Sequence, residues 1–386
     1  MVGIYIHIPF CASRCIYCAF YSTTSLDLRQ RYIEAVCREI QSRQSDDTVS
    51  TIYLGGGTPS QLSASQLQLL FDTLYIYYKV SPDAEITIEA NPDDVTPEFA
   101  TVLQQLPINR VSMGAQTFDD VRLQWLHRRH NSRQVGEAVS RLRQAGVQNI
   151  SVDLMYGFPH QTQADWEQDI SAVLALGVEH ISAYCLSIEE GTELWRKVES
   201  GKWKENTEEA ERLMYYTLID RLEAAGFEHY EISNFARPGY RSRHNTSYWT
   251  GIPYIGLGAA AHSFDGCTRS WNIDDIRQYI DGIEHDTRRF DSEPIEGDTA
   301  YNDQLTTALR TREGLDLRLL SERQRAYCRR TAQRFIDDGL LTLHDEHLSL
   351  ARRGLFVSDM IISDLMLIES LQEKITLPSV SDSGCA

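Results

Sequence analysis

Three cysteines near the N-terminus are the residues best suited to metal chemistry. The stretch FCASRCIYCAF (10–20) holds Cys11, Cys15 and Cys18 in the spacing C-x3-C-x2-C. Three thiols cannot all pair in disulfides, and zinc sites usually show a second C-x2-C pair, which the sequence lacks. His7 is a poor fourth ligand, because the side chains on either side of it in a strand-like run face the other way. Three soft thiolates on one tight loop favour an iron–sulfur cluster.

A [4Fe–4S] cube held by three cysteines has one iron without a protein ligand. That iron can bind a substrate or cofactor through nitrogen and oxygen atoms. A zinc knuckle and three reduced structural thiols are the alternatives. The other five cysteines stand alone in the sequence, and we expect reduced, buried side chains or a tail thiol.

The residues before 235 predict repeated strand–helix units that would position this loop. Strand-like runs and helical periodicities alternate along this part of the chain. The expected strands cover 3–8, 51–54, 84–90, 109–115, 149–157, 180–188 and 228–233. The expected helices cover 28–41, 63–78, 96–106, 132–146, 163–176 and 207–225. This order predicts an α/β fold, a partial (β/α)6 barrel over residues 1–235 with right-handed crossovers.

Glycine and polar residues gather directly after the predicted strands. GGGTPS (55–60) follows the second strand, EANPDD (89–94) ends the third, GAQTF (114–118) the fourth, DLMYG (153–157) the fifth and SIEEGT (187–192) the sixth. Parallel strands present their carboxyl ends at one edge of the sheet, where this architecture carries its active site. We therefore expect these residues to surround the cysteine loop.

The part of the chain after residue 235 does not continue the repeated strand–helix pattern. Residues 236–290 are rich in glycine and aromatic residues and predict a loop-rich extension, which contains RHNTSYW (243–249). The acidic stretch DSEPIEGD (291–298) predicts a linker. Helical segments and a short hairpin predict a winged-helix-like, mostly helical domain within 291–372, and 373–386 reads as a frayed tail.

The charge of the chain argues against a nucleic-acid partner. Its formal net charge is −18, which disfavours attraction to nucleic acid or anionic lipid. A nucleic-acid-binding module around RRTAQR (329–334) is therefore the weakest of the functions considered. No run is long enough for a transmembrane helix, and the chain enters a strand at Gly3 with no signal-like segment. We expect a cytoplasmic protein whose contact with the membrane, at its inner face, is at most peripheral.

The cysteine spacing resembles the signature of the radical S-adenosylmethionine superfamily, and the strings around it resemble the oxygen-independent coproporphyrinogen III oxidase family. The matching strings are YIHIPFC, GGGTP, EANP, NRVSMGAQTF, RRH and DLMYGFPHQT. The resemblance implies a [4Fe–4S] cluster on Cys11, Cys15 and Cys18, with S-adenosylmethionine on the open iron. It also implies S-adenosylmethionine contacts by Tyr5, Gly56, Gly57, Thr58, Glu89, Gln116, Arg128 and Asp153.

The segment RHNTSYW is similar to the HNxxYW motif of a haem chaperone branch of this family. The resemblance implies that His244 binds haem. An imidazole is a good axial ligand for haem iron, and Tyr248 and Trp249 could stack on a porphyrin face. The alternative is a histidine packed within a loop.

Position 20 distinguishes two functions within the family. Coproporphyrinogen dehydrogenases carry a fourth cysteine two residues after the third, where this chain has Phe20. The haem chaperones commonly have Asp at position 19, where this chain has Ala19. The resemblance favours a haem chaperone that delivers haem to membrane respiratory proteins, as a monomer or a dimer. The alternative is an enzyme that decarboxylates coproporphyrinogen III oxidatively, and cofactor turnover stays open between the two.

Overall fold

The computed structural model describes residues 1–367, which form two compact units. The first unit comprises Met1–Pro294, and the second begins at Ile295. The predicted tail (373–386) and the last five residues of the predicted C-terminal domain (291–372) lie outside the described residues.

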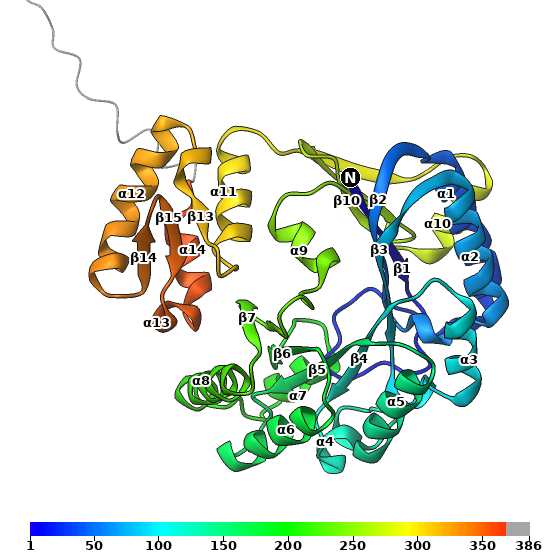
Figure 1. The fold of residues 1–386 in the computed structure, drawn as a ribbon, viewed down its shortest axis with the longest axis horizontal. Helices are drawn as coiled ribbons and strands as arrows, with labels where there is room; N and C mark the ends of the chain where they lie inside the picture. The colour runs from blue at the N-terminus through cyan, green and yellow to red at the C-terminus, as the bar shows by residue number, and fades with distance from the viewer. Residues whose placement is uncertain (368–386) are drawn as a thin grey trace, which may run out of the picture. The chain divides into compact units, whose positions relative to one another are not determined.

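Six parallel strands form the framework of the first unit, which confirms the predicted (β/α)6 arrangement (Figure 1). They are β1 (Val2–Ile8), β2 (Ser45–Gly56), β3 (Tyr78–Ala90), β4 (Arg110–Gln116), β5 (Asn149–Tyr156) and β6 (His180–Cys185). Each strand pairs in parallel with the next along the chain. Their carboxyl ends therefore meet at one edge of the sheet, next to the cysteine loop.

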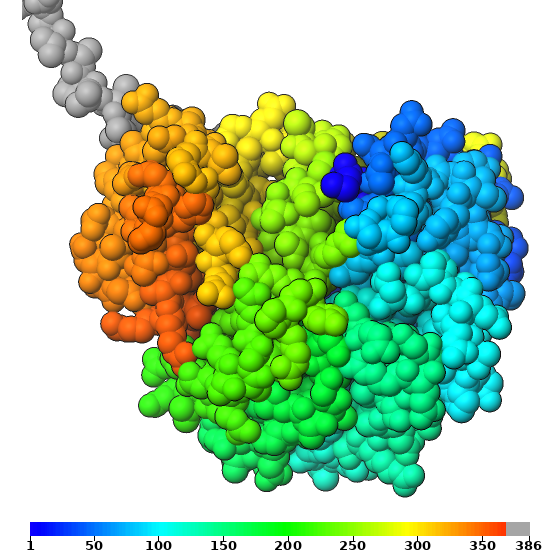
Figure 2. Space-filling model, viewed as in Figure 1, coloured from blue at the N-terminus to red at the C-terminus, as the bar shows by residue number. Residues whose placement is uncertain are grey.

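Helices connect the strands and cover the outer side of their arc (Figure 1). They are α1 (Arg29–Ser42), α2 (Ala64–Tyr77), α3 (Pro97–Gln105), α4 (Asp120–Trp125), α5 (Ser132–Gln144), α6 (Gln163–Ala175), α7 (Glu193–Glu199) and α8 (Glu208–Ala224). Ser63, Asn131 and Thr162 start α2, α5 and α6 with capping boxes, which satisfy the first backbone N–H groups. In the space-filling view the surface of the first unit follows chain order from α2 in blue to α8 in green (Figure 2).

The segment predicted as a loop-rich extension is an ordered part of the same sheet. Its elements and the short strands before it are β7 (Glu228–Glu231), β8 (Asn234–Ala236), α9 (Arg243–Trp249), β9 (Tyr254–Leu257), β10 (His262–Phe264), β11 (Thr268–Asn272) and α10 (Ile276–Glu284). β9 pairs in parallel with β1 on the side opposite β2. A Cβ atom at Gly256 would lie 1.9 Å from the carbonyl oxygen of His262. The glycine that suggested a loop therefore permits the close approach of β9 and β10.

The predicted acidic linker is also partly a strand. β12 (Phe290–Pro294) pairs antiparallel with β11 at the edge of the sheet, and all five of its residues are exposed. Charged side chains are typical of an exposed edge strand, because they oppose pairing with other chains. The composition of residues 291–294 therefore reflects a sheet edge and not a disordered connection.

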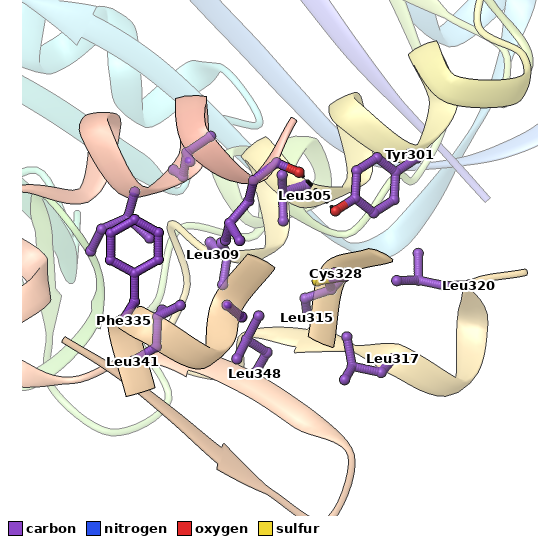
Figure 3. Packing of buried hydrophobic residues seen from close by; sticks show 14 residues of the cluster. Tyr301, Leu305, Leu309, Leu315, Leu317, Leu320, Cys328, Phe335, Leu341 and Leu348 are labelled. Atoms are coloured by element: carbon purple, nitrogen blue, oxygen red, sulfur yellow. Dashed lines mark hydrogen bonds between the residues drawn. The ribbon is translucent and has the colours of Figure 1, made fainter. Parts of the chain in front are cut away.

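The second unit packs helices against a small antiparallel sheet, as predicted for the C-terminal domain. Its elements are α11 (Gly297–Ala308), β13 (Leu315–Asp316), α12 (Glu322–Asp337), β14 (Leu341–His344), β15 (His347–Leu350), α13 (Arg352–Leu355) and α14 (Ser358–Leu365). The strand order is β13-β15-β14. Leucines dominate its core, among them Leu305, Leu309 and Leu315, which pack with Phe335 and Cys328 (Figure 3).

The described residues can be compared with the expectations on membrane-spanning helices and on the state of the cysteines. Within residues 1–367, no helix is both long enough and apolar enough to span a lipid bilayer. The seven cysteines in this range are all free thiols.

Candidate functional site

The cysteine loop leaves β1 and is closed at its base by backbone hydrogen bonds. The amide of Cys11 donates to the carbonyl of Thr23 (2.9 Å), and the amide of Thr23 donates to the carbonyl of Pro9 (2.7 Å). Within the loop, the amide of Cys18 donates to the carbonyl of Cys15 (3.2 Å). Backbone hydrogen bonds thus close the loop at its base and between Cys15 and Cys18.

The three thiols form a donor set that fits an iron–sulfur cluster. Burial raises the pKa of Cys11 and of Cys18, and the nearby Cys15 raises both further. Both thiols therefore keep their protons at neutral pH, and iron binding, which requires thiolates, would release them. In residues 1–367, no three His, Cys, Asp or Glu side chains are arranged so that together they could hold one metal ion. Three thiols on one loop fit a polynuclear cluster in which each binds a different iron.

Two of the predicted cofactor residues donate hydrogen bonds to the cysteine sulfurs. Thr58 donates through Oγ1 to Cys11 Sγ, and Arg128 donates through Nη1 to Cys15 Sγ, both over 3.6 Å. Donors directed at cluster sulfurs stabilise the thiolate form and tune the reduction potential. The loop after β2 and the loop after α4 therefore both reach the cysteines.

The triple glycine after β2 lies against the base of the cysteine loop. A Cβ atom at Gly57 would lie 2.8 Å from the carbonyl oxygen of Ile8 and from the carbonyl carbon of Pro9. Gly56 has a φ of +110°, and a Cβ there would lie 2.4 Å from the ring of His7. The backbone at Gly56 and Gly57 therefore lies closer to β1 and the base of the cysteine loop than a residue with a side chain would allow.

Glu89 and Asp153 bring two partly buried carboxyl groups to the inner face of the sheet. Glu89 accepts hydrogen bonds from Tyr53 Oη (2.7 Å) and from the amide of Gly56 (3.0 Å), and burial raises its pKa to about 7. Asp153 accepts from Ser112 Oγ (3.3 Å), and burial raises its pKa as well. An ionised carboxylate in this position can accept hydrogen bonds from ligand hydroxyls.

Arg128 spans the space between the cysteines and β4. Its Nη2 donates to Asn91 Oδ1 (2.7 Å) and to the carbonyl of Gly114 (2.5 Å). Its Nε is buried without an acceptor. An unsatisfied buried N–H on a guanidinium is an open position for a ligand carboxylate. The neighbouring Gln116 ends β4 with a φ of 69°. Its side-chain nitrogen lies over Gly114, where an added Cβ atom would be 2.7 Å from it.

Comparisons with known proteins agree with this arrangement. The Radical SAM superfamily matches residues 5–173, and the HemN C-terminal domain matches residues 295–357. The chain is 34% identical over 374 residues to "Heme chaperone HemW" of Mycobacterium tuberculosis, covering 94% of both chains. The chain belongs to the HemW family of radical SAM proteins. It is also 39% identical over 289 residues to "Heme chaperone HemW" of Bacillus subtilis, which covers 73% of this chain and 76% of that protein.

A solved structure confirms the fold expected for the HemW family. It is described as "Coproporphyrinogen III oxidase (HemN) from Escherichia coli is a Radical SAM enzyme", with a TM-score of 0.82 over 95% of this chain and 90% of that chain. Sequence identity is 21%, so the likeness concerns the fold. Membership of the radical SAM superfamily implies a [4Fe–4S] cluster and S-adenosylmethionine, and the residues around the cysteine loop are chemically suited to both.

The structure places His244 at a buried position inside the first unit. It is on α9, on the inner side of the strand arc (Figure 1), and is 1% exposed. Its Nδ1 lies 2.8 Å from Thr51 Oγ1, and its Nε2 lies 2.9 Å from Tyr248 Oη. Each ring nitrogen therefore has a hydroxyl group as its hydrogen-bond partner.

Phe20, at the position that distinguishes the two functions, is 71% exposed beside Cys18.

Sequence reasoning did not find Tyr53 or Asn91, which contact Glu89 and Arg128. Strand alternation could have identified Tyr53, because it is the register partner of Tyr5 on β1. Asn91 lies within the string EANP, which was matched from the sequence, but its side-chain contact with Arg128 was not predicted.

Proposed function

We propose that this protein is a haem chaperone that binds a [4Fe–4S] cluster, S-adenosylmethionine and haem, and delivers haem to respiratory proteins. The observation that carries the proposal is 34% identity across 94% of both chains to a protein named "Heme chaperone HemW". The receiving proteins would be membrane-associated, which would bring this chain to the inner face of the membrane during delivery. The complete cysteine loop and the buried polar groups beside it support the cofactor part of the proposal.

Each residue predicted to hold the cluster or S-adenosylmethionine has a role in this proposal. Cys11, Cys15 and Cys18 hold the cluster, and Arg128 directs its free Nε at the cofactor carboxylate. Gly56 and Gly57 present backbone groups to the cofactor amino group, with Thr58 beside them. Glu89 and Asp153 accept hydrogen bonds from ribose hydroxyls, and Tyr5 and Gln116 complete the walls of the site. When bound, the cluster and S-adenosylmethionine supply one-electron chemistry.

Haem transfer after anaerobic reconstitution tests the chaperone role. The reconstituted protein is titrated with haem, and the haem-loaded form is mixed with a haem-free respiratory acceptor in membranes. We expect a saturable haem spectrum and transfer to the acceptor. A Cys15→Ala variant, which lacks one cluster ligand, shows whether transfer needs the cluster. Absence of saturable haem binding by the fully reconstituted protein would refute the proposal.

The alternative function is oxidative decarboxylation of coproporphyrinogen III. The HemN-like fold, with a TM-score of 0.82, favours it, and Phe20 in place of a fourth cysteine disfavours it. The same anaerobic preparation is given coproporphyrinogen III, S-adenosylmethionine and an electron donor. Formation of protoporphyrinogen, without haem transfer, would replace the chaperone proposal by the enzymatic one.

A further inference from the structure

A buried column of aromatic rings links α9 to the proposed cofactor site. The imidazole of His244 stacks with the ring of Tyr53, with centroids 5.1 Å apart and planes at 26°. It also stacks with Tyr5, at 6.4 Å and 28°. Tyr5 and Tyr53 are register partners on β1 and β2, and their own rings stack at 6.2 Å. One histidine therefore contacts two tyrosines on the inner face of adjoining strands.

Each of the two tyrosines also contacts a residue at or next to the proposed cofactor site. Tyr53 donates its hydroxyl hydrogen to Glu89 (2.7 Å). The hydroxyl of Tyr5 lies 3.0 Å from Nδ1 of His7, whose Nε2 lies 3.0 Å from the carbonyl oxygen of Tyr21. Tyr21 follows the last cluster cysteine by three residues. His244 is thus connected through Tyr53 to the Glu89 carboxyl group, and through Tyr5 and His7 to the end of the cysteine loop.

We propose that His244 is a positioning residue for the S-adenosylmethionine site, holding Tyr53 and through it Glu89, and is not an iron ligand. The inference rests on the proposed cofactor site and does not depend on haem binding. It gives the HNxxYW motif a role within the first unit that accounts for its burial.

Contacts on every side fix the imidazole. Thr51 and Tyr248 engage its two nitrogens. A Cβ atom at Gly3 would lie 3.4 Å from the ring, so β1 passes close beside it. The amides of Arg243 and His244 both donate to the carboxylate of Glu85, at 3.1 and 3.0 Å, which anchors the start of α9 to β3. Rotation of the ring toward a ligand would break both of its hydrogen bonds, while the anchored backbone keeps it beside β1.

The charge state of His244 is consistent with a positioning role. Burial, and to a lesser degree the nearby Arg110, lowers its pKa to about 3. The ring is therefore neutral at physiological pH, with one donor and one acceptor nitrogen. Each matches a hydroxyl group, because Thr51 and Tyr248 can donate or accept. A neutral ring adds no charge beside Glu89, so its influence on the site is one of position.

Three variants of the reconstituted full chain test the inference through S-adenosylmethionine affinity, measured by equilibrium binding. His244→Phe keeps a stacking ring and loses both hydrogen bonds, whereas Thr51→Val removes one bond and leaves His244 itself in place. We expect affinity to fall about tenfold in His244→Phe and about threefold in Thr51→Val. His244→Asn, which can keep the bond to Thr51, should recover part of the loss. Haem spectra and haem affinity should match the wild type in all three.

His180 provides a matched control in the same sheet. Its Nδ1 lies 2.7 Å from Ser151 Oγ and its Nε2 lies 2.8 Å from Tyr230 Oη, and it is fully buried. His180→Phe therefore removes the same two kinds of bond on β6, away from Tyr53 on β2. It leaves in place the hydrogen bond of 3.4 Å by which the amide of Ser242, at the start of α9, donates to Tyr230 Oη. We expect a similar fall in melting temperature with unchanged cofactor affinity.

The outcomes separate this inference from the proposed function. Wild-type cofactor affinity in both His244→Phe and Thr51→Val would overturn the positioning role. An equal loss of affinity in His180→Phe would also overturn it, because it would indicate general destabilisation. A changed haem spectrum in His244→Phe with cofactor affinity retained would overturn it as well and would restore His244 as an iron ligand. Failure of the wild type itself to bind S-adenosylmethionine would instead refute the proposed cofactor site.

Discussion

Arg128 donates a hydrogen bond from Nη1 to the sulfur of Cys15 over 3.6 Å. The same guanidinium donates from Nη2 to the carbonyl of Gly114 on β4 and leaves its buried Nε without an acceptor. One side chain therefore connects the cysteine loop, the sheet and an open hydrogen-bonding position. This geometry requires a planar fork of donors, which lysine does not have.

Arg128→Lys should therefore weaken S-adenosylmethionine binding while keeping the positive charge. Loss of one or two charge-assisted hydrogen bonds, each worth about 1.5–3 kcal/mol, corresponds to a loss of affinity of at least about tenfold. Equilibrium binding to the reconstituted protein measures it. Arg143→Lys is the control, because Arg143 binds Glu179 through two bonds of 2.7 and 2.8 Å outside the site. Equal affinities of wild type and Arg128→Lys would contradict the assignment.

Cofactor binding should depend on pH through Glu89. Burial raises its pKa from an ordinary value of 4.5 to about 7, so the folded protein holds this proton more tightly than the unfolded chain. The contribution of Glu89 to stability is thus fully present at a pH below its ordinary pKa and is lost as pH rises through about 7. The ionised carboxylate, which accepts ligand hydroxyls, forms over the same range. We expect S-adenosylmethionine affinity to increase from pH 6 to about 8.

Two variants check the origin of this pH dependence. Glu89→Gln should bind weakly at every pH, with a flat profile. Tyr53→Phe removes a hydrogen bond that lowers the pKa of Glu89, so its profile should move to higher pH. An unchanged midpoint in Tyr53→Phe would show that a different group titrates.

Gly57→Ala should disturb the cysteine loop. The added methyl group would lie 2.8 to 2.9 Å from backbone atoms of Ile8, Pro9 and Phe10, which cannot move as a side-chain end can. We expect a destabilisation of about 1–3 kcal/mol and a reduced iron content after reconstitution. Gly136→Ala on α5 is the control, because its methyl group would meet only Leu176 at 3.8 Å. Full iron loading of Gly57→Ala would show that the loop tolerates the displacement.

The core of the second unit should depend on Leu309. It is fully buried among the leucines shown in Figure 3, so Leu309→Ala removes packed atoms and leaves a cavity. We expect a loss of about 2–5 kcal/mol in the stability of this unit. Chemical denaturation of the full chain measures it, with Leu319→Ala as the control, since Leu319 is 70% exposed. Similar losses in both variants would contradict the packing described here.

The sheet and the edge that carries the site could be predicted because local patterns decide them. The inner strands carry buried apolar residues at alternating positions, such as Ile4, Ile6 and Ile8 on β1. Gly146, Gly177 and Gly226 follow the ends of their helices with positive φ. The polar strings then fall after the strands as a consequence of the repeat. For this reason Thr58 and Glu89 could be placed together from the sequence, whereas Arg128, which follows α4, was assigned to the site through the family resemblance.

The surroundings of His244 could not be predicted, because contacts distant in sequence decide them. α9 has only seven residues, and its position depends on Glu85, which is 159 residues away from His244. The early parts of β2 and β3 were missed for a similar reason. Their polar residues 45–50 and 78–83 lack an apolar run, and they become strands by pairing with each other. Short polar strands have little local signal.

The parallel pairing of β9 with β1 sets a limit on where this chain can be divided. A fragment that ends at residue 235, the predicted limit of the barrel, would lose the partner of Gly3–Ile6. The backbone groups on that side of β1 would then form an open edge, and such edges promote aggregation. The smallest fragment of the first unit expected to stay monodisperse therefore extends through Pro294, where β12 supplies a charged edge.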